Sequence, residues 1–330
     1  MTTRRNLLFA LGLGALSVAL PASAQRSTEV RRIGFLGSRA RATPSKPNTA
    51  YDAFVRGMRE LGYVEGKNLI IEWRYAAGNY ALLPSLAAEL VQLNVEVIVT
   101  HSTPGALAAK QATSKIPIVF ASSGDPVANG LVASLARPGG NLTGLSNLSS
   151  EASTKHLEFL KELLPKLTHV GVFVNPSVPF QTSMRTYQAT ANKLGVTLSE
   201  IHAATADEIT RGFAAIVASR AKAVAFTNDS FFSEREVQIA ELALRHRLPS
   251  AFVHRGSVLA GGLFCYGPNA DDNYHGAATY VDKILDGAKP GELPVQQPTK
   301  LRLAFNLKTA KALGLTISPA LLLRADEIME

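Results

Sequence analysis

Short apolar segments alternate with segments of helical length along most of this 330-residue chain. The apolar segments, whose β-branched residues are typical of buried strands, are residues 31–36, 68–75, 96–100 and 117–120. The segments between them with apolar residues at helical spacing are residues 51–61, 82–93 and about 104–113. This alternation predicts an α/β fold, with a parallel sheet doubly wound by helices on both faces.

The same pattern starts again after Gly144. Strands are expected at residues 169–174, 196–201, 223–227, 249–253 and 263–266. Helices are expected at residues 151–164, 181–194, 206–219 and 234–247. We therefore predict two Rossmann-like lobes, residues 25–144 and 145–268, joined by a hinge with a cleft between them. Residues 269–330 are expected to return and pack mainly on the first lobe.

One strand end is central to this prediction. The apolar string IPIVF at 116–120 breaks into the small polar turn ASSGDPV at 121–127. Ligands of open α/β sheets bind beyond the carboxyl ends of the strands, so residues 121–125 are expected to form one wall of the cleft. The string RPGGNLTG at 137–144 is expected to be the first hinge crossing.

The first 24 residues have the pattern of an export signal. Arg4 and Arg5 precede an apolar run at residues 7–20, which is too short to span a bilayer comfortably. Ala22 and Ala24 are small residues at the positions that a signal peptidase reads, so cleavage is expected after Ala24. The twin arginines fit either the twin-arginine route or an ordinary secretory signal.

Composition narrows the function further. The chain has one cysteine, Cys265, so no intrachain disulfide is possible and a buried structural thiol is expected. The formal net charge is +8, or +6 without Arg4 and Arg5. The basic residues are scattered and not interleaved with aromatic residues, which argues against nucleic acid as a partner.

Catalytic, metal and cofactor motifs are missing from the sequence. The seven histidines show no metal-binding spacing, and no Cys-x-x-Cys pair is present. The chain has no Gly-x-Ser-x-Gly elbow, no Walker A loop and no Gly-x-Gly-x-x-Gly after its first strand. We therefore expect neither a metal nor a cofactor, and a protein that is not an enzyme.

Several strings resemble one known family. They are GMRELGYVEGKN at 57–68, IPIVFASSGDPV at 116–127, the region 131–144 ending RPGGNLTG, and LPVQQPTK at 293–300. In this order they resemble bacterial ABC-transporter substrate-binding proteins of the type that includes tryptophan- and tyrosine-binding proteins. The resemblance covers about residues 31–330 and implies a type I periplasmic-binding-protein fold.

The resemblance implies a monomer that captures a small molecule and delivers it to the membrane permease of an ABC importer. Many such proteins are lipoproteins anchored through a cysteine after the signal. Here Gln25 follows the signal, so a soluble periplasmic form in a Gram-negative source is expected. A sensory module that presents its ligand to a membrane kinase or chemoreceptor is the alternative, and an exported α/β enzyme is a third class.

In the first lobe, the candidate ligand contacts follow strand ends. Ser102 and Thr103 match a Thr-Pro turn at the ligand in the family, and a helix N-terminus there suits a carboxylate. A plain helix cap before Pro104 is the alternative. Ser122, Ser123 and Asp125 form a second group, in which Asp125 either accepts an ammonium group or caps the turn. Weaker candidates in the opening loop are Ser38, Asn48 and Tyr51.

The second lobe offers candidates of the same kind. Asn175 and Ser177 match a family loop, although two prolines depart from its usual form. Asn228 and Asp229 match a family Asp-Asn pair in reversed order, and Asp229 is the strongest candidate for an ammonium or hydroxyl contact. The remaining candidates are Phe231 or Phe232 for stacking, Arg255 for a carboxylate and Tyr266. An amino acid or small aromatic acid would suit this set.

Overall fold

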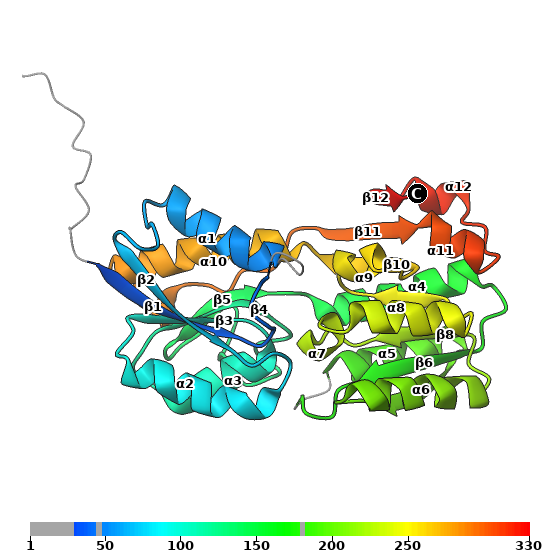
Figure 1. The fold of residues 1–330 in the computed structure, drawn as a ribbon, viewed down its shortest axis with the longest axis horizontal. Coiled ribbons are helices and arrows are strands. Elements are labelled where there is room, and N and C mark those ends of the chain that lie inside the picture. The colour runs from blue at the N-terminus through cyan, green and yellow to red at the C-terminus, as the bar shows by residue number, and fades with distance from the viewer. Residues whose placement is uncertain (1–29, 44–47, 179–181) are drawn as a thin grey trace, which may run out of the picture.

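The computed structural model describes residues 30–43, 48–178 and 182–330, and shows two α/β lobes side by side (Figure 1). The predicted export signal at residues 1–24 lies outside the described residues. No helix in the described part of the chain is long and apolar enough to cross a membrane.

Lobe 1 is built on a five-stranded parallel sheet with the order β2-β1-β3-β4-β5. Its strands are β1 (Arg31–Gly37), β2 (Leu69–Tyr75), β3 (Val97–Thr100), β4 (Ile118–Ser123) and β5 (Leu142–Ser146). Its helices are α1 (Thr49–Glu60), η1 (Tyr80–Leu82), α2 (Leu83–Gln92), α3 (Thr103–Ala112), α10 (Ala270–Leu285) and η2 (Pro290–Glu292). All four residues of β3 are buried, as expected for a central strand covered on both faces.

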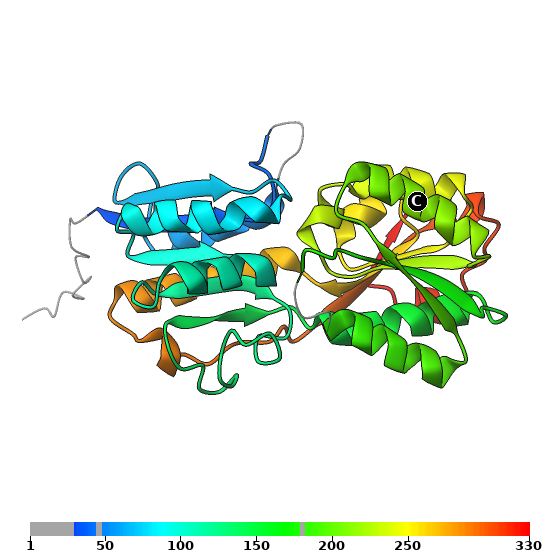
Figure 2. The ribbon, with the colours of Figure 1, turned by 90° about the horizontal axis from the view of Figure 1, so that it is seen from below.

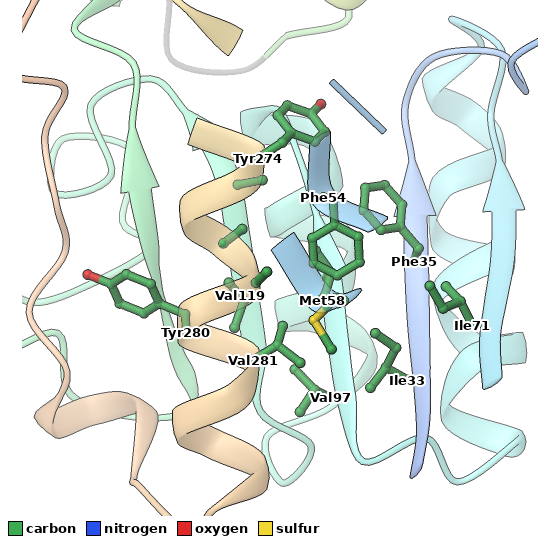
Figure 3. Close-up of a cluster of buried hydrophobic side chains, with 14 of the residues drawn as sticks. Ile33, Phe35, Phe54, Met58, Ile71, Val97, Val119, Tyr274, Tyr280 and Val281 are labelled. Carbon is green, nitrogen blue, oxygen red and sulfur yellow. The ribbon is translucent and has the colours of Figure 1, made fainter. Parts of the chain in front are cut away.

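Each face of the lobe 1 sheet has its own apolar core. On one face, Phe54 and Met58 of α1 and Val281 of α10 pack on the strands, as Figure 3 shows. On the other face, Leu90 of α2 and Ala106 of α3 pack on residues such as Ile98 and Phe120. The sheet is therefore doubly wound, as the sequence predicts.

Lobe 2 contains a seven-stranded mixed sheet with the order β12-β11-β10-β9-β8-β6-β7. Its strands are β6 (His169–Val174), β7 (Thr197–His202), β8 (Ala223–Phe226), β9 (Ser250–Phe252), β10 (Phe264–Pro268), β11 (Leu301–Asn306) and β12 (Glu327–Met329). Its helices are α4 (Ser149–Leu163), α5 (Thr182–Leu194), α6 (Ala206–Ala218), α7 (Ser230–Ser233), α8 (Glu236–Arg245), α9 (Arg255–Leu259), α11 (Leu307–Ala312) and α12 (Pro319–Leu322). Figure 2 shows the twisted sheet between its two helix layers.

The C-terminal segment corrects one expectation. Its first part packs on lobe 1, where α10 lies against α1 and Val295, beyond η2, joins the core on the other face of the sheet. The chain then returns to lobe 2, where β11 pairs antiparallel with β10 and β12 pairs with β11 (Figure 1). The apolar residues Leu303 and Phe305 complete the lobe 2 core, which explains why this segment does not stay on lobe 1.

The chain crosses between the lobes three times, near residues 147–148, 269 and 298–300 (Figure 1). The first crossing lies later than predicted, because β5 continues through Gly144 to Ser146 in the lobe 1 sheet. At this crossing Leu148 has a φ of +49°, in the left-handed region that branched side chains rarely adopt. Because the three crossings lie close together, a change in a few backbone angles would be enough to open or close this hinge.

Candidate ligand-binding site

A cavity of about 1090 Å³ lies between the two lobes. It is lined from lobe 1 by residues that follow β1, β3, β4 and β5, and from lobe 2 by residues that follow β8, β9 and β10. Its volume is at the upper end of the range for small-molecule sites. The strand ends of two sheets thus open onto one shared space.

The lobe 1 wall begins where β3 ends. Ser102 has a φ of +67°, and its hydroxyl caps α3 by accepting a hydrogen bond from Gly105 N at 3.3 Å. Ser102 and Thr103, which the sequence suggests as ligand contacts, both line the cavity at the N-terminal end of α3. A serine in this strained conformation is the kind of backbone feature that clusters at ligand sites. Ser38, by contrast, is fully buried behind Ser102, and their hydroxyls lie 2.7 Å apart.

His101 also lies in this wall, although the sequence suggested only its neighbours Ser102 and Thr103 as ligand contacts. It lines the cavity and is 4% exposed, and neither of its ring nitrogens has a hydrogen-bond partner in the described part of the chain. Burial, followed by the nearby charge of Arg39, lowers the pKa of His101 to about 3, so its imidazole is neutral at pH 7. An unpartnered buried polar ring is costly, and such groups call for a functional reason.

The turn after β4 contributes two of the three predicted residues. Ser122 and Asp125 line the cavity, whereas Ser123 is fully buried and lies 3.2 Å from the Thr103 hydroxyl. The exposed carboxylate of Asp125 accepts hydrogen bonds from Val127 N at 3.1 Å and Ala128 N at 3.0 Å. Of the two roles considered for Asp125, the geometry supports the turn cap.

The lobe 2 wall follows β8. Asn228 and Asp229, which the sequence suggests as ligand contacts, line the cavity. His254, which follows β9, donates through Nε2 to Asn228 Oδ1 at 2.9 Å, and burial lowers the pKa of this imidazole to about 4. This bond fixes the orientation of the Asn228 amide. The amide nitrogen, Nδ2, then points away from His254 as a hydrogen-bond donor.

Asp229 is buried, with 7% of the residue exposed. Its Oδ1 accepts from Phe231 N at 2.8 Å and from Asn175 Nδ2 at 3.1 Å, and its Oδ2 accepts from the Tyr80 hydroxyl at 2.8 Å. Burial raises the pKa of Asp229, and these hydrogen bonds oppose that rise. The carboxylate therefore has little room left for the ammonium contact that the sequence predicts.

Besides Ser38 and Ser123, five more candidate residues do not line the cavity. Phe231 is 1% exposed and packs on Phe232 in the lobe 2 core, so it does not line the cavity as the stacking prediction required. Tyr266 packs edge-on against Phe159, also away from the cavity lining. The remaining three are Asn175, Ser177 and Tyr51. Asn175 donates to Asp229, Ser177 N donates to Asn175 Oδ1, and the Tyr51 ring packs beside His101.

Arg255 lines the cavity but already holds a carboxylate of the protein itself. Its Nε and Nη2 donate to the two carboxylate oxygens of Glu327, each at 2.6 Å. The Arg255 side chain is 58% exposed. The bidentate geometry foreseen for a ligand carboxylate is therefore made to the strand β12 of the same lobe.

Further lining residues, which the sequence did not single out as ligand contacts, are Arg39, Asn129, Asn147, Ser149, Ser230, Glu234, Arg235 and Tyr274. Most follow a strand end by only a few residues, and that position was the available signal. Tyr274 lies one helical turn into α10 and reaches the site only because α10 packs on lobe 1. Within the described residues, no group of three or more His, Cys, Asp and Glu residues could hold a metal ion.

Two doubly wound lobes, three crossings and a polar cavity at the strand ends define a two-lobed ligand-binding protein of the type I periplasmic-binding class. The sequence matches the family of ABC transporter substrate binding proteins over residues 44–329, and the chain belongs to that family. This confirms both the fold class and the family that the sequence motifs resemble.

Relatives support the same assignment. A tyrosine-binding protein of Clostridioides difficile (strain R20291) is 29% identical over 267 residues, which is 81% of this chain and 76% of the relative. A conserved domain protein from Vibrio cholerae has a similar structure, with a TM-score of 0.83 and 30% identity over 91% of this chain and 100% of that chain.

Two further solved structures differ in how well they superpose. The ABC domain from Streptococcus pneumoniae in complex with L-Trp has a TM-score of 0.80 at 25% identity, over 90% of this chain and 100% of that chain. The ligand-free, open structure of a substrate binding protein with adhesive properties from Clostridium difficile has a TM-score of 0.64 at 26% identity, over 91% and 99%. At similar identity, this protein superposes better on the L-Trp complex than on the ligand-free, open structure.

Proposed function

We propose that this protein is the periplasmic solute-binding component of an ABC importer, and that it captures an amino acid or small aromatic acid between its lobes. The observation that carries this proposal is the cavity between the lobes, onto which polar residues of both lobes open. Closure of the lobes around a ligand would give the permease a distinct shape to recognise.

Two arginines of the cavity lining already pair with carboxylates of the protein. Arg39 is paired with Glu234 at 3.1 Å, and Arg255 is paired with Glu327. A zwitterionic amino acid brings one positive and one negative group and leaves no uncompensated charge in the closed site. The relative named for tyrosine binding and the similar structure bound to L-Trp support the same class of ligand.

An aromatic ligand side chain has a matching surface. The rings of Tyr274 and His101 both line the cavity, with 5.6 Å between their centroids. Neutral His101 offers one donor and one acceptor beside this ring. A phenol or an indole supplies a polar hydrogen together with an aromatic face, so L-tyrosine and L-tryptophan are the first ligands to test.

Calorimetric titration and thermal-shift assays of residues 25–330 test the proposal. The panel contains L-tryptophan, L-tyrosine, L-phenylalanine, small aromatic acids, nucleosides and sugars. Ligand at about 100 times its dissociation constant adds about 2.7 kcal/mol to the unfolding free energy. If no amino acid or aromatic acid raises the melting temperature, the proposed ligand class is wrong.

Transport and export need their own measurements. Uptake of the labelled ligand by cells should fall when the gene is deleted, and the recovered ligand should be chemically unchanged after binding.

Cell fractionation and N-terminal sequencing test export with cleavage after Ala24, and replacing Arg4 and Arg5 with lysines separates the two export routes. Light scattering tests whether the protein is a monomer.

A further inference from the structure

The short helix α7 of lobe 2 is contacted by lobe 1 at both of its ends. At its N-terminal end, the Tyr80 hydroxyl donates to Asp229 Oδ2 at 2.8 Å and accepts from Ser230 N at 3.1 Å. Tyr80 lies in η1 of lobe 1, so both hydrogen bonds join the two lobes. We call the contacts of Tyr80 and Arg39 with residues 229–234 the α7 interlobe contact.

Arg39 makes the contact at the other end of α7. Its Nε donates to Glu234 Oε1 at 3.1 Å, and Ala40 N donates to the same oxygen at 3.3 Å. Between the two ends, lobe 1 approaches closely at Gly78, where an added Cβ would lie 3.7 Å from Phe231 Cα. The two lobes therefore meet along the whole length of α7.

Water is largely excluded from these contacts. Asp229 is 7% exposed, the Glu234 side chain is 9% exposed, and the Arg39 side chain is 26% exposed. Burial lowers the pKa of Arg39, but the Glu234 carboxylate together with Tyr274 and Tyr51 more than offsets this effect, so the pKa of Arg39 is raised. Charged hydrogen bonds shielded in this way are stronger than exposed ones.

We propose that Tyr80 is a positioning residue that sets ligand affinity by holding α7 against lobe 1, with the Arg39–Glu234 pair as the second half of the same contact. Tyr80 does not line the cavity, so it acts on the closed state and not on the ligand. The inference rests on the proposed function, in which the closed state is the one that retains ligand.

The expected effect follows from the two states. When the lobes separate, water can hydrate Asp229 and Glu234, so loss of a contact weakens only the closed state. Apparent affinity falls in proportion to the population of the closed state. Removing one hydrogen bond to a charged group is expected to lower that population about tenfold.

The first experiment needs no ligand. Single-molecule energy transfer between one dye on each lobe measures the closed fraction of the wild type, Tyr80→Phe, Arg39→Gln and the control Tyr75→Phe. Tyr75 lies on β2 of lobe 1 and its ring stacks on Trp73 of the same strand. We expect a lower closed fraction in Tyr80→Phe and Arg39→Gln only. An unchanged closed fraction in both variants would overturn the proposal.

The second experiment measures affinity for L-tryptophan and L-tyrosine. Tyr80→Phe should weaken both by the same factor, about tenfold, mainly through a faster dissociation rate. A loss confined to one amino acid would mean that Tyr80 touches the ligand, which contradicts the proposal. If the wild type binds neither amino acid, the proposed ligand class fails, and the ligand-free closed fractions still decide the role of Tyr80.

Discussion

The imidazole of His101 lies beside the ring of Tyr274, with 5.6 Å between the ring centroids, and its two nitrogens have no hydrogen-bond partner within the described residues. The two rings come from segments that are distant in the sequence, since His101 follows β3 and Tyr274 belongs to α10. A partnerless imidazole destabilises the free protein, and a ligand that bonds to it would recover that cost.

Replacing His101 with phenylalanine should therefore separate stability from binding. The ring shape is kept while the unpaired nitrogens are removed, so the unfolding free energy should stay the same or rise by up to about 1 kcal/mol. Affinity for L-tyrosine or L-tryptophan should fall at least about tenfold, the loss of one buried hydrogen bond. Urea unfolding and calorimetry measure the two effects. A stable His101→Phe protein with full affinity would show that the imidazole has no part in binding.

Stability should fall as the pH is lowered from about 7 to 5. Burial lowers the pKa of His101 to about 3, and the pKa values of His156 and His254 to about 4, below the ordinary 6.5 of the unfolded chain. The unfolded state then binds more protons than the folded state, so the unfolding free energy rises with pH in this window. Each histidine contributes a slope of up to about 1.4 kcal/mol per pH unit.

The His101→Phe variant is the matched control for this pH dependence. It has one buried histidine fewer, so its unfolding free energy should fall less between pH 7 and 5 than that of the wild type. Urea unfolding curves at several pH values give both slopes. Equal slopes for the two proteins would mean that His101 is charged, or exposed to solvent, in the folded state.

Local pattern was enough to predict most of the sheet architecture. The buried strand predicted at residues 169–174 is β6. The strand predicted at 96–100 corresponds to β3, which begins one residue later, at Val97. Such strands are apolar throughout because helices cover both faces, and that pattern needs no knowledge of neighbouring segments. Strand β5 was missed because its sequence, LTGLS, has the glycine and small polar residues of a loop.

Contacts between distant segments could not be predicted in the same way. Tyr80 and Asp229 are 149 residues apart, and nothing near either residue indicates the other. The carboxylate of Asp229 looked available for a ligand because sequence shows a charge but not its partners. For the same reason, Arg255 was assigned to a ligand carboxylate when the structure pairs it with Glu327.

Asp125→Ala should cost stability and leave ligand affinity nearly unchanged. The carboxylate caps Val127 N and Ala128 N, and loss of such a cap destabilises a protein by about 1 kcal/mol. Asp125→Asn keeps an oxygen that can accept the same bonds and should be close to the wild type. Thermal unfolding and titration with L-tryptophan measure both quantities. If both variants lose affinity while keeping their stability, the charge of Asp125 contacts the ligand after all.

Gly144→Ala should destabilise the protein far more than Gly140→Ala, although both glycines lie in the same string, RPGGNLTG, before the first crossing. Gly144 pairs with Phe120 in the sheet at a φ of +145°, and an added Cβ would lie 2.1 Å from Phe120 O. That clash is with backbone, so β4 and β5 must separate, at a cost of more than about 4 kcal/mol. At Gly140 the φ is +64° and no atom lies within 4 Å of the added carbon, so only the backbone strain of about 1–2 kcal/mol applies. Urea unfolding of the two variants measures the difference. Equal stabilities would mean that β5 is not held against β4 as the structure shows, and the position of the first crossing after Ser146 would then be wrong as well.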